Sequence, residues 1–251
     1  MIDTHVHCHL INQPPQQIWE ESRQAGVTHM IQVAIDEDSI AFNQTLANTY
    51  DWCSATAGIH PLSVQPDMDI NHILGVLDQV KSNIVAIGEI GLDYKYGQDL
   101  QSLQAEWFHA QLSFAKEAKL PVIIHSRQCD ADMLAIVNQY PDLKKVFHCY
   151  ATDVSFYEQL KGDHNYVSFT GMITFAKKGK VIRALKQIDL NRLMLETDAP
   201  YLNPKEAKDG QNHPKNIVHI ARAIAEHRNI DLDEVVKQTN QNAIDFFSLE
   251  L

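Results

Sequence analysis

The stretch Asp3-Thr4-His5-Val6-His7-Cys8-His9 stands at the end of the first apolar run of the chain. A doubly wound, nucleotide-binding sheet carries a glycine-rich phosphate loop at this first strand-to-helix turn. Histidines stand here instead, and they favour a different arrangement of parallel strands and helices. Side chains alternate along a strand, so His5 and His7 are expected to share one face.

Short apolar runs alternate with longer amphipathic stretches along the whole chain. The runs are rich in Val, Ile and Phe and are too short for helices, so each predicts a strand. The eight predicted strands cover residues 1–7, 28–35, 53–60, 84–90, 121–125, 145–148, 166–174 and 192–198.

The intervening stretches have helical periodicity. Between residues 103 and 118 an apolar residue recurs every three or four positions, which predicts one face of a helix. That face comprises Leu103, Trp107, Ala110, Phe114 and Ala118. Residues 217–227 and 232–247 predict two terminal helices. Eight strands, each followed by a helical segment, predict an α/β fold of the (β/α)8 TIM-barrel class. No linker or repeat interrupts the pattern, so residues 1–251 are expected to form a single domain.

The composition limits the compartment and the partners. The chain has 21 basic and 32 acidic side chains and a formal net charge of −11, whereas non-specific nucleic-acid binding usually needs a basic excess. No apolar run is long enough for a transmembrane helix, and no signal-peptide pattern is visible. Four widely spaced cysteines indicate reduced thiols. We therefore expect a cytoplasmic protein without membrane association, and a monomer is compatible with the sequence.

Polar residues recur at the carboxyl ends of the predicted strands, where a barrel places its functional groups. Burying them singly would be costly without partners, and a divalent metal site satisfies them jointly. The candidate ligands are His5, His7, Glu89, His125, His148 and Asp198. Six ligands exceed the need of one zinc ion, so we expect two divalent ions, with Glu89 as the bridge. Mixed nitrogen and oxygen ligands suit Zn²⁺, Mn²⁺ or Mg²⁺ without choosing among them.

Several segments resemble, in order, the signatures of the TatD family of metal-dependent deoxyribonucleases. They are Asp3-Thr4-His5-Val6-His7, Gly58-Ile59-His60-Pro61, Ala86-Ile87-Gly88-Glu89-Ile90-Gly91-Leu92-Asp93-Tyr94, Pro121-Val122-Ile123-Ile124-His125, Phe147-His148-Cys149-Tyr150 and Leu195-Glu196-Thr197-Asp198-Ala199-Pro200-Tyr201-Leu202. The resemblance implies an amidohydrolase-type TIM barrel and phosphodiester hydrolysis, commonly from a 3′ end. It also implies metal ligation by the same six candidate ligands.

The predicted mechanism uses a metal-activated water. Asp198 and Glu89 are the candidate catalytic residues, and Asp198 can both ligate a metal and accept the proton of the water. Three further residues are candidates for substrate binding, each with a structural alternative. Arg127 can bind a phosphate or form a surface salt bridge. His60 can bind substrate or pack behind a ligand. Tyr94 can stack on a base or cap the barrel.

Two departures from the family pattern leave the substrate open. Residues 203–214 lack the arginines that this family usually carries there, and Leu62 follows His60-Pro61 in place of a histidine. Arginine forms the forked contact with phosphate that lysine cannot reproduce, so we expect DNA or another phosphodiester to bind weakly. The alternative is a metal-dependent hydrolase of another ester, lactone or amide. A third possibility is a binding protein that has kept the scaffold.

Overall fold

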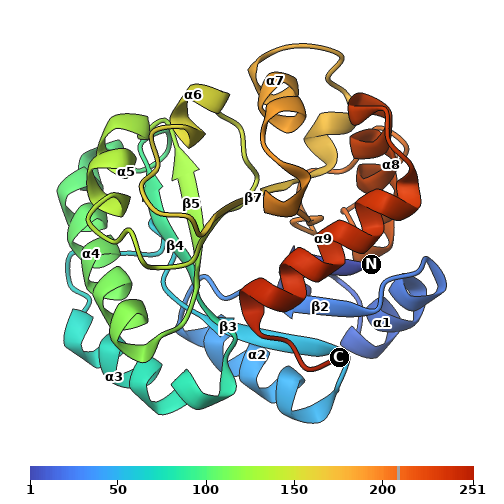
Figure 1. Cartoon of the computed structure of the whole chain (residues 1–251). Helices are drawn as coiled ribbons and strands as arrows, with labels where there is room; N and C mark the ends of the chain where they lie inside the picture. Colours follow the sequence, from blue (N-terminus) through green and yellow to red (C-terminus); the bar gives the residue numbers. More distant parts are fainter. Residues whose placement is uncertain (208–209) are drawn as a thin grey trace. The chain divides into compact units, whose positions relative to one another are not determined.

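The computed structural model of the chain describes residues 1–207 and 210–251. The chain divides into two compact units. Unit 1 comprises Met1–Gln32, Cys149–Glu158 and Tyr166–Leu251, and unit 2 comprises Val33–His148 and Gln159–Asn165. Strands and helices alternate along the chain (Figure 1). Each unit contains four parallel strands.

Unit 1 contains the first two and the last two strands. The strands are β1 (Ile2–Val6), β2 (His29–Gln32), β7 (Asn165–Phe169, whose first residue belongs to unit 2) and β8 (Leu193–Leu195). The α-helices are α1 (Pro15–Gln24), α6 (Val154–Tyr157), α7 (Lys180–Gln187), α8 (Ile217–Arg228) and α9 (Leu232–Phe247). Short 3-10 helices are η1 (Cys8–Leu10), η4 (Gly171–Thr174), η5 (Leu190–Arg192) and η6 (Pro214–Asn216).

The first and last strands of the chain are neighbours in unit 1. β1 pairs with β2 and β7 pairs with β8, all parallel. Val6 forms a parallel bridge with Ala199, and the His7 N–H donates to the Ala199 carbonyl at 2.8 Å. The Asp198 N–H donates to the His5 carbonyl at 2.9 Å. Hydrogen bonds between the two ends of the strand series are typical of a closed barrel rather than an open sheet.

Unit 2 contains the four middle strands in chain order. They are β3 (Cys53–Ala57), β4 (Ala86–Asp93), β5 (Val122–Arg127) and β6 (Lys145–Phe147), each parallel to the next. The helices are α2 (Glu37–Thr49), α3 (Ile70–Val80), η2 (Lys81–Asn83), η3 (Gln98–Leu100), α4 (Gln101–Ala118) and α5 (Asp130–Val137). α2 packs against β3 and α4 packs against β4. Both predicted terminal helices of unit 1 and the predicted helix at 103–118 are confirmed.

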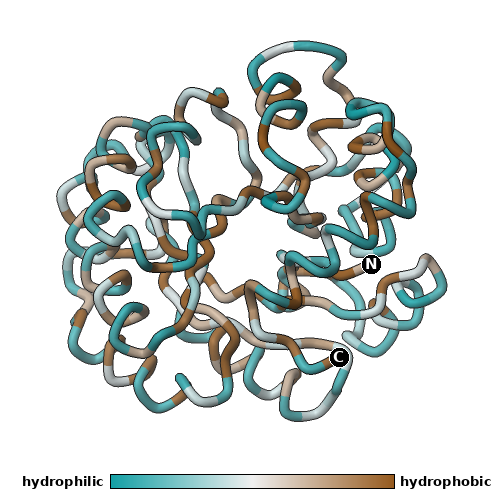
Figure 2. The backbone as a smooth tube through the Cα atoms, viewed as in Figure 1, coloured by the Kyte–Doolittle hydropathy of each residue, from teal (hydrophilic) through white to brown (hydrophobic). Residues whose placement is uncertain are grey.

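The buried face of α4 differs from the predicted face. Trp107 is buried as predicted, whereas Leu103 and Phe114 are only half-buried. Phe108, Leu112 and Ala115 are buried as well, and so are two glutamines, Gln104 and Gln111. The mixture of hydrophobic and hydrophilic residues along the helix is visible in Figure 2. The two glutamines are seven residues apart, two helical turns, and therefore lie on one face. An apolar-periodicity argument cannot find such residues, because their amides are buried for their hydrogen bonds.

Four predicted strands end three or more residues earlier than expected: β2 ends at Gln32 rather than at residue 35, β3 at Ala57 rather than at residue 60, and β7 and β8 also end early. β7 ends at Phe169 rather than at residue 174, because the Thr170 side chain accepts the Met172 N–H at 3.5 Å and starts η4. β8 ends at Leu195 rather than at residue 198, and Asp198 has a left-handed φ of 55°, which no extended strand contains.

Other expectations concern cysteines and membranes. The four cysteines are all free thiols, as predicted: Cys8, Cys53, Cys129 and Cys149. Over residues 1–207 and 210–251, the helices are too short or too polar to cross a lipid bilayer.

We predict that residues 1–251 unfold as one cooperative domain. The chain passes between the two units four times, at residues 32/33, 148/149, 158/159 and 165/166, so neither unit is a continuous segment. A calorimetric scan should show one transition, with equal calorimetric and van't Hoff enthalpies. Two resolved transitions would contradict the single-domain prediction.

Candidate metal centre

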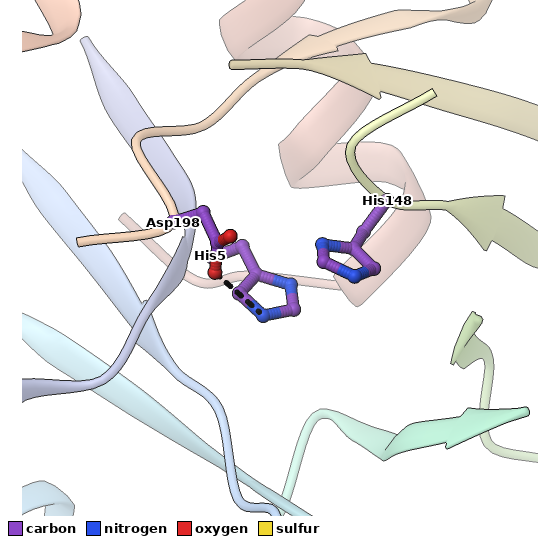
Figure 3. A group of neighbouring side chains, drawn as sticks. All are labelled: His5, His148 and Asp198. Atoms are coloured by element: carbon purple, nitrogen blue, oxygen red, sulfur yellow. Dashed lines mark ion pairs between the residues drawn. The ribbon is translucent and has the colours of Figure 1, made fainter. Parts of the chain in front are cut away.

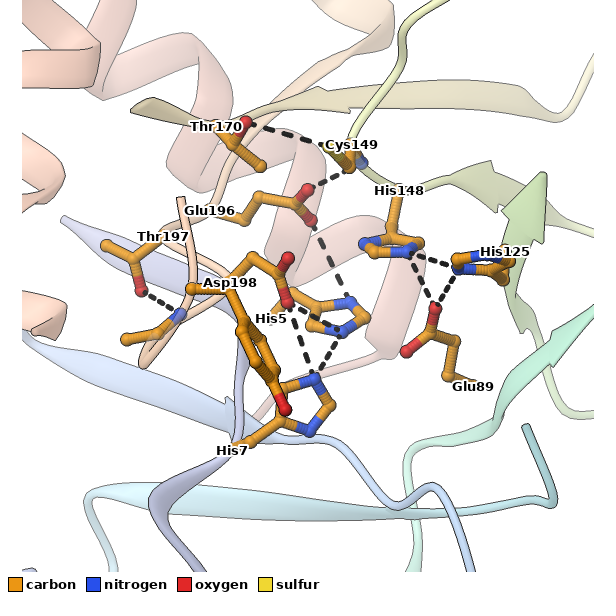
Figure 4. Close-up of polar contacts among 12 residues, drawn as sticks. His5, His7, Glu89, His125, His148, Cys149, Thr170, Glu196, Thr197 and Asp198 are labelled. Carbon is orange, nitrogen blue, oxygen red and sulfur yellow. Dashed lines mark hydrogen bonds and ion pairs between the residues drawn. The ribbon is translucent and has the colours of Figure 1, made fainter. Parts of the chain in front are cut away.

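Three side chains of unit 1 converge at the ends of β1 and β8. The Nε2 atoms of His5 and His7 are 3.1 Å apart, and they lie 3.7 Å and 3.4 Å from Oδ1 of Asp198. His5 and His7 therefore share one face of the strand, as the alternation predicts. Figure 3 shows the contact between His5 and Asp198, and Figure 4 shows the three side chains together. We call these three residues the His5 cluster.

Buried carboxylates hold the His5 cluster in place. Asp3 accepts the Thr197 N–H at 2.9 Å and the Thr197 hydroxyl at 2.5 Å, and so ties β1 to the segment that carries Asp198. Burial raises the pKa of the Asp3 carboxyl to about 7, although the bonds from Thr197 oppose the shift. Glu196 accepts the Cys149 N–H and the Ser168 hydroxyl, each at 2.6 Å. His5 lies next to these hydrogen bonds, with its Nδ1 3.9 Å from Glu196 Oε2.

A second group of donor atoms converges in unit 2 on one oxygen of Glu89. His125 Nδ1 and His148 Nε2 each lie 2.7 Å from Glu89 Oε1 (Figure 4). His60 Nε2 lies 3.6 Å from the same oxygen. His60, Glu89 and His125 each offer a ligand atom close enough to the others for a single ion. We call His60, Glu89, His125 and His148 the Glu89 cluster.

Burial and charge act in opposite directions on the Glu89 cluster. Burial raises the pKa of Glu89, but the imidazoles of His148, His60 and His125 lower it more, so the carboxyl pKa lies well below its usual range. Burial lowers the pKa of His125, whereas its bonds to Asp93 and Glu89 raise it above the usual value. The side chain of Glu89 is only 4% exposed, so its negative charge depends on these partners.

Glycines allow β4 to approach β5 closely enough to form this cluster. A Cβ at Gly91, which has a φ of +148°, would overlap the carbonyl oxygen of His125. A Cβ at Gly88 would lie 2.7 Å from the Cβ of Ile123. Glycine is therefore required on both sides of Glu89: Gly91 lies against the backbone of His125, and Gly88 lies against Ile123.

The buried glutamines of α4 hold the strand ends of unit 2. Gln104 Oε1 accepts the Asp93 N–H at 2.9 Å, at the end of β4. Gln111 Oε1 accepts the Ile59 N–H at 2.8 Å, and its Nε2 donates to the Ile59 carbonyl at 3.2 Å. Ile59 precedes His60, and the side chain of Asp93 contacts His125. One helix therefore holds the backbone beside both histidines.

Asp93 orients the imidazole of His125. Its Oδ2 lies 3.0 Å from His125 Nε2, while the Nδ1 of the same ring faces Glu89. A proton on Nε2 that is donated to Asp93 leaves the Nδ1 lone pair directed at the cluster. A carboxylate behind a histidine in this way is the usual partner of a metal-binding imidazole.

The three predicted substrate-binding residues lie in unit 2. His60 is part of the Glu89 cluster, and its Nδ1 accepts the Leu62 N–H at 3.1 Å. Arg127 is exposed at the end of β5, with its guanidinium 4.9 Å from the centre of the Tyr96 ring. Tyr94 donates its hydroxyl to Asp132 at 2.7 Å, so its polar end is occupied by the protein.

The loop after β8 contacts the loops that follow β1 and β7 in unit 1. The Lys205 N–H donates to the Thr174 hydroxyl at 2.8 Å, and Gln211 Oε1 accepts the Asn12 N–H at 3.1 Å. Lys205 is exposed. Lys208, the other lysine of this loop, lies outside the described residues.

Comparisons with known proteins agree with this geometry. The family model for TatD related DNase matches residues 2–248. The chain belongs to the TatD family. It is 28% identical to the uncharacterized metal-dependent hydrolase YabD of Bacillus subtilis (strain 168), over 99% of both chains. It is 32% identical to the 3'-5' ssDNA/RNA exonuclease TatD of Edwardsiella piscicida, over 93% of both.

The fold comparison agrees as well. The crystal structure of YJJV, a TatD homologue from Escherichia coli K12, matches with a TM-score of 0.90 at 26% identity, over 100% of this chain and 98% of that one. The predicted (β/α)8 barrel is therefore confirmed, and so is the predicted enzyme class, a metal-dependent hydrolase of the TatD family.

Sequence reasoning did not select Asp93, Glu196, Gln104 or Gln111 as site residues. Glu196 is two residues before Asp198 within the predicted strand 192–198, so alternation along a strand gave a signal for this carboxylate. Asp93 lies beyond the predicted strand 84–90 and had no such signal. The glutamines could only be found once the packing of α4 was known.

We predict that Asp93→Asn weakens metal binding by about 10- to 100-fold, because the amide loses the charge that supports the His125 imidazole. Competition with a chromophoric chelator for Zn²⁺ measures the affinity. Asp78→Asn, at an exposed ion pair on α3, serves as the control and should keep the wild-type affinity. An unchanged affinity in Asp93→Asn would show that Asp93 only shapes the loop.

Proposed function

We propose that the protein is a metal-dependent exonuclease that hydrolyses the phosphodiester bonds of single-stranded DNA from the 3′ end. The observation that carries this proposal is the convergence of buried and half-buried imidazole and carboxylate groups in the His5 cluster and in the Glu89 cluster. The name of the relative from Edwardsiella piscicida, a 3'-5' ssDNA/RNA exonuclease, supports the substrate class.

The donor atoms fit divalent cations. In the His5 cluster, two imidazole nitrogens and one carboxylate oxygen face one another within 3.7 Å. Nitrogen and oxygen ligands of this kind suit Zn²⁺ and Mn²⁺, and Mg²⁺ takes the carboxylates. We propose that His5, His7 and Asp198 hold one ion and that Glu89, His125 and His148 hold a second. That Glu89 bridges the two ions stays a prediction.

Divalent ions bound there would lower the pKa of a coordinated water and polarise a phosphoryl oxygen. The protein's own contribution is orientation and proton transfer. Asp198 has the more accessible carboxylate, 12% exposed against 4% for Glu89, so it can reach an incoming water and accept its proton. Glu89, held by its imidazole partners, keeps its negative charge in the site.

Arg127 is proposed to donate hydrogen bonds to the phosphate of the substrate. It follows His125 by two residues on β5, and its exposed guanidinium presents a forked set of N–H groups. His60, within the Glu89 cluster, has a proton to donate from Nε2 while its Nδ1 accepts the Leu62 N–H. A terminal phosphodiester would thus contact the guanidinium of Arg127 and the imidazole of His60, which belong to the same unit.

A single experiment separates this function from its alternatives. Single-stranded oligodeoxynucleotides labelled at the 3′ or the 5′ end are incubated with Mn²⁺, Zn²⁺ or Mg²⁺, beside an RNA strand and a panel of esters, lactones and amides. We expect nucleotides to be released from the 3′ end and release to stop with a chelator. Turnover of the ester or amide panel alone would favour the other hydrolase. Undiminished turnover in metal-free protein would overturn the proposed mechanism.

Asp198→Asn should lower the rate of nucleotide release by about 10² or more, because the amide cannot accept a proton and is a poorer ligand. The rate constant is measured at saturating Mn²⁺, and circular dichroism verifies the fold. Asp233→Asn, an exposed carboxylate at the start of α9, is the control and should retain activity. Near-normal turnover by Asp198→Asn would assign Asp198 a structural role.

A further inference from the structure

Exposed apolar side chains gather in the loops that follow the strands. Of the six large apolar residues that are exposed in the described chain, five lie in such loops and the sixth is the terminal Leu251. The five are Leu62, Tyr96, Met172, Phe175 and Tyr201. Tyr96, in the loop between β4 and α4 of unit 2, is 63% exposed. An aromatic ring held in solvent at a functional face is a common feature of a binding surface.

Two cations lie against the Tyr96 ring. The ammonium of Lys95 and the guanidinium of Arg127 are each 4.9 Å from its centre. Neither has an ion-pair partner within the part of the chain that the structure describes. These positive charges stand on a protein of net charge −11, at the ends of the strands that carry the Glu89 cluster. An anionic ligand would therefore be attracted to this ring locally.

The Tyr96 loop is connected to the Glu89 cluster through Asp93. Asp93 Oδ1 accepts the N–H groups of Lys95 and Tyr96, each at 2.9 Å, while Oδ2 of the same carboxylate contacts His125. Arg127 follows His125 by two residues on β5, about 6–7 Å along the strand. The Tyr94 N–H donates to the Arg127 carbonyl at 2.9 Å and joins the two strand ends. The backbones that carry the ring, the cations and the candidate ligand are therefore joined by hydrogen bonds.

Leu62 extends the apolar surface next to the ring. A Cβ at Gly97 would lie 3.1 Å from Leu62 Cδ2, so this side chain packs across the residue that follows Tyr96. The resulting patch, Leu62 and Tyr96 with Lys95 and Arg127 beside them, has the composition of a single-strand binding surface: a flat apolar face with cations for the adjoining phosphates.

We propose that this patch is a base-stacking subsite, in which the Tyr96 ring and the planar face of the Arg127 guanidinium receive one nucleobase, while the N–H edge of that guanidinium serves the scissile phosphate and Lys95 contacts the neighbouring phosphate. The assignment rests on the proposed nuclease function and adds to it Tyr96 as the residue that stacks on a base. Every base has a π-face, so the subsite tolerates any sequence, and a paired base inside a duplex cannot reach it. It assigns the stacking role to Tyr96 instead of Tyr94.

The test is a double-mutant cycle between the ring and single bases of the substrate. Binding of an eight-nucleotide single-stranded DNA is measured by fluorescence anisotropy in Ca²⁺, with one abasic residue placed in turn at each of the last four positions. For the wild type, one abasic position should weaken binding by about 5- to 100-fold. Tyr96→Ala should weaken binding of the intact strand by a similar factor and remove the penalty at that position.

Matched variants complete the design. Tyr96→Phe keeps the ring and should bind as the wild type does, while Arg127→Ala should reduce the same abasic penalty. Arg192→Ala is the control, because Arg192 also lies over a tyrosine, 5.1 Å from the ring centre of Tyr166 at the amino end of β7, and it should change nothing.

The outcomes separate the two proposals. Cleavage of DNA by the wild type, together with abasic penalties that Tyr96→Ala leaves unchanged at every position, overturns the stacking subsite and leaves the nuclease function standing. A wild-type protein that neither binds nor cleaves DNA or RNA overturns the nuclease function and the subsite with it. Loss of one abasic penalty in Tyr96→Ala alone, with retention in Tyr96→Phe, supports the assignment.

Discussion

The site of unit 2 depends on one buried negative charge, the carboxylate of Glu89. An ionised carboxylate in an apolar interior costs several kcal/mol unless partners compensate it. Here the compensation comes from His60, His125 and His148, whose ring nitrogens lie between 2.7 and 3.6 Å from one oxygen. His60 follows β3, His125 lies within β5 and His148 follows β6, so the charge of Glu89 is compensated only when these strands are assembled around β4 in the correct register.

The backbone of unit 2 is adapted to that requirement. Glycine on either side of Glu89 lets β4 come closer to β5 than any side chain would allow. The amides of Gln104 and Gln111 then satisfy backbone groups at the strand ends, where the sheet ladder no longer does so. A helix on the outside of the strands thus determines where the loops next to the cluster begin. Asp93 continues the chain of contacts from the cluster outward to the Tyr96 loop.

In unit 1 the His5 cluster is held in place by different contacts. The cluster lies where the first and last strands of the chain meet. Asp3 and Glu196 hold the backbone and side chains around His5 and Asp198 through hydrogen bonds from N–H and hydroxyl groups. Charge-assisted bonds of this kind are short and directional, so they fix the position of Asp198 although its backbone has left the strand conformation. The two clusters share a donor chemistry but are built from unrelated supports.

The sequence by itself determined the alternating order of strands and helices, the shared face of His5 and His7, and the candidate ligands. Side-chain alternation along a strand and apolar periodicity along a helix are local properties of a chain. The sequence placed α4, α8 and α9 nearly to the residue, and it placed the strand ends less well where a side-chain cap or a left-handed residue intervened. Only the tertiary structure decided that Gln104 faces Asp93, that Asp93 supports His125 and that Arg127 lies over Tyr96. Those contacts join residues from different elements, and their formation depends on which helix face meets which loop. That choice is made by the packing of the whole unit, and no local pattern encodes it.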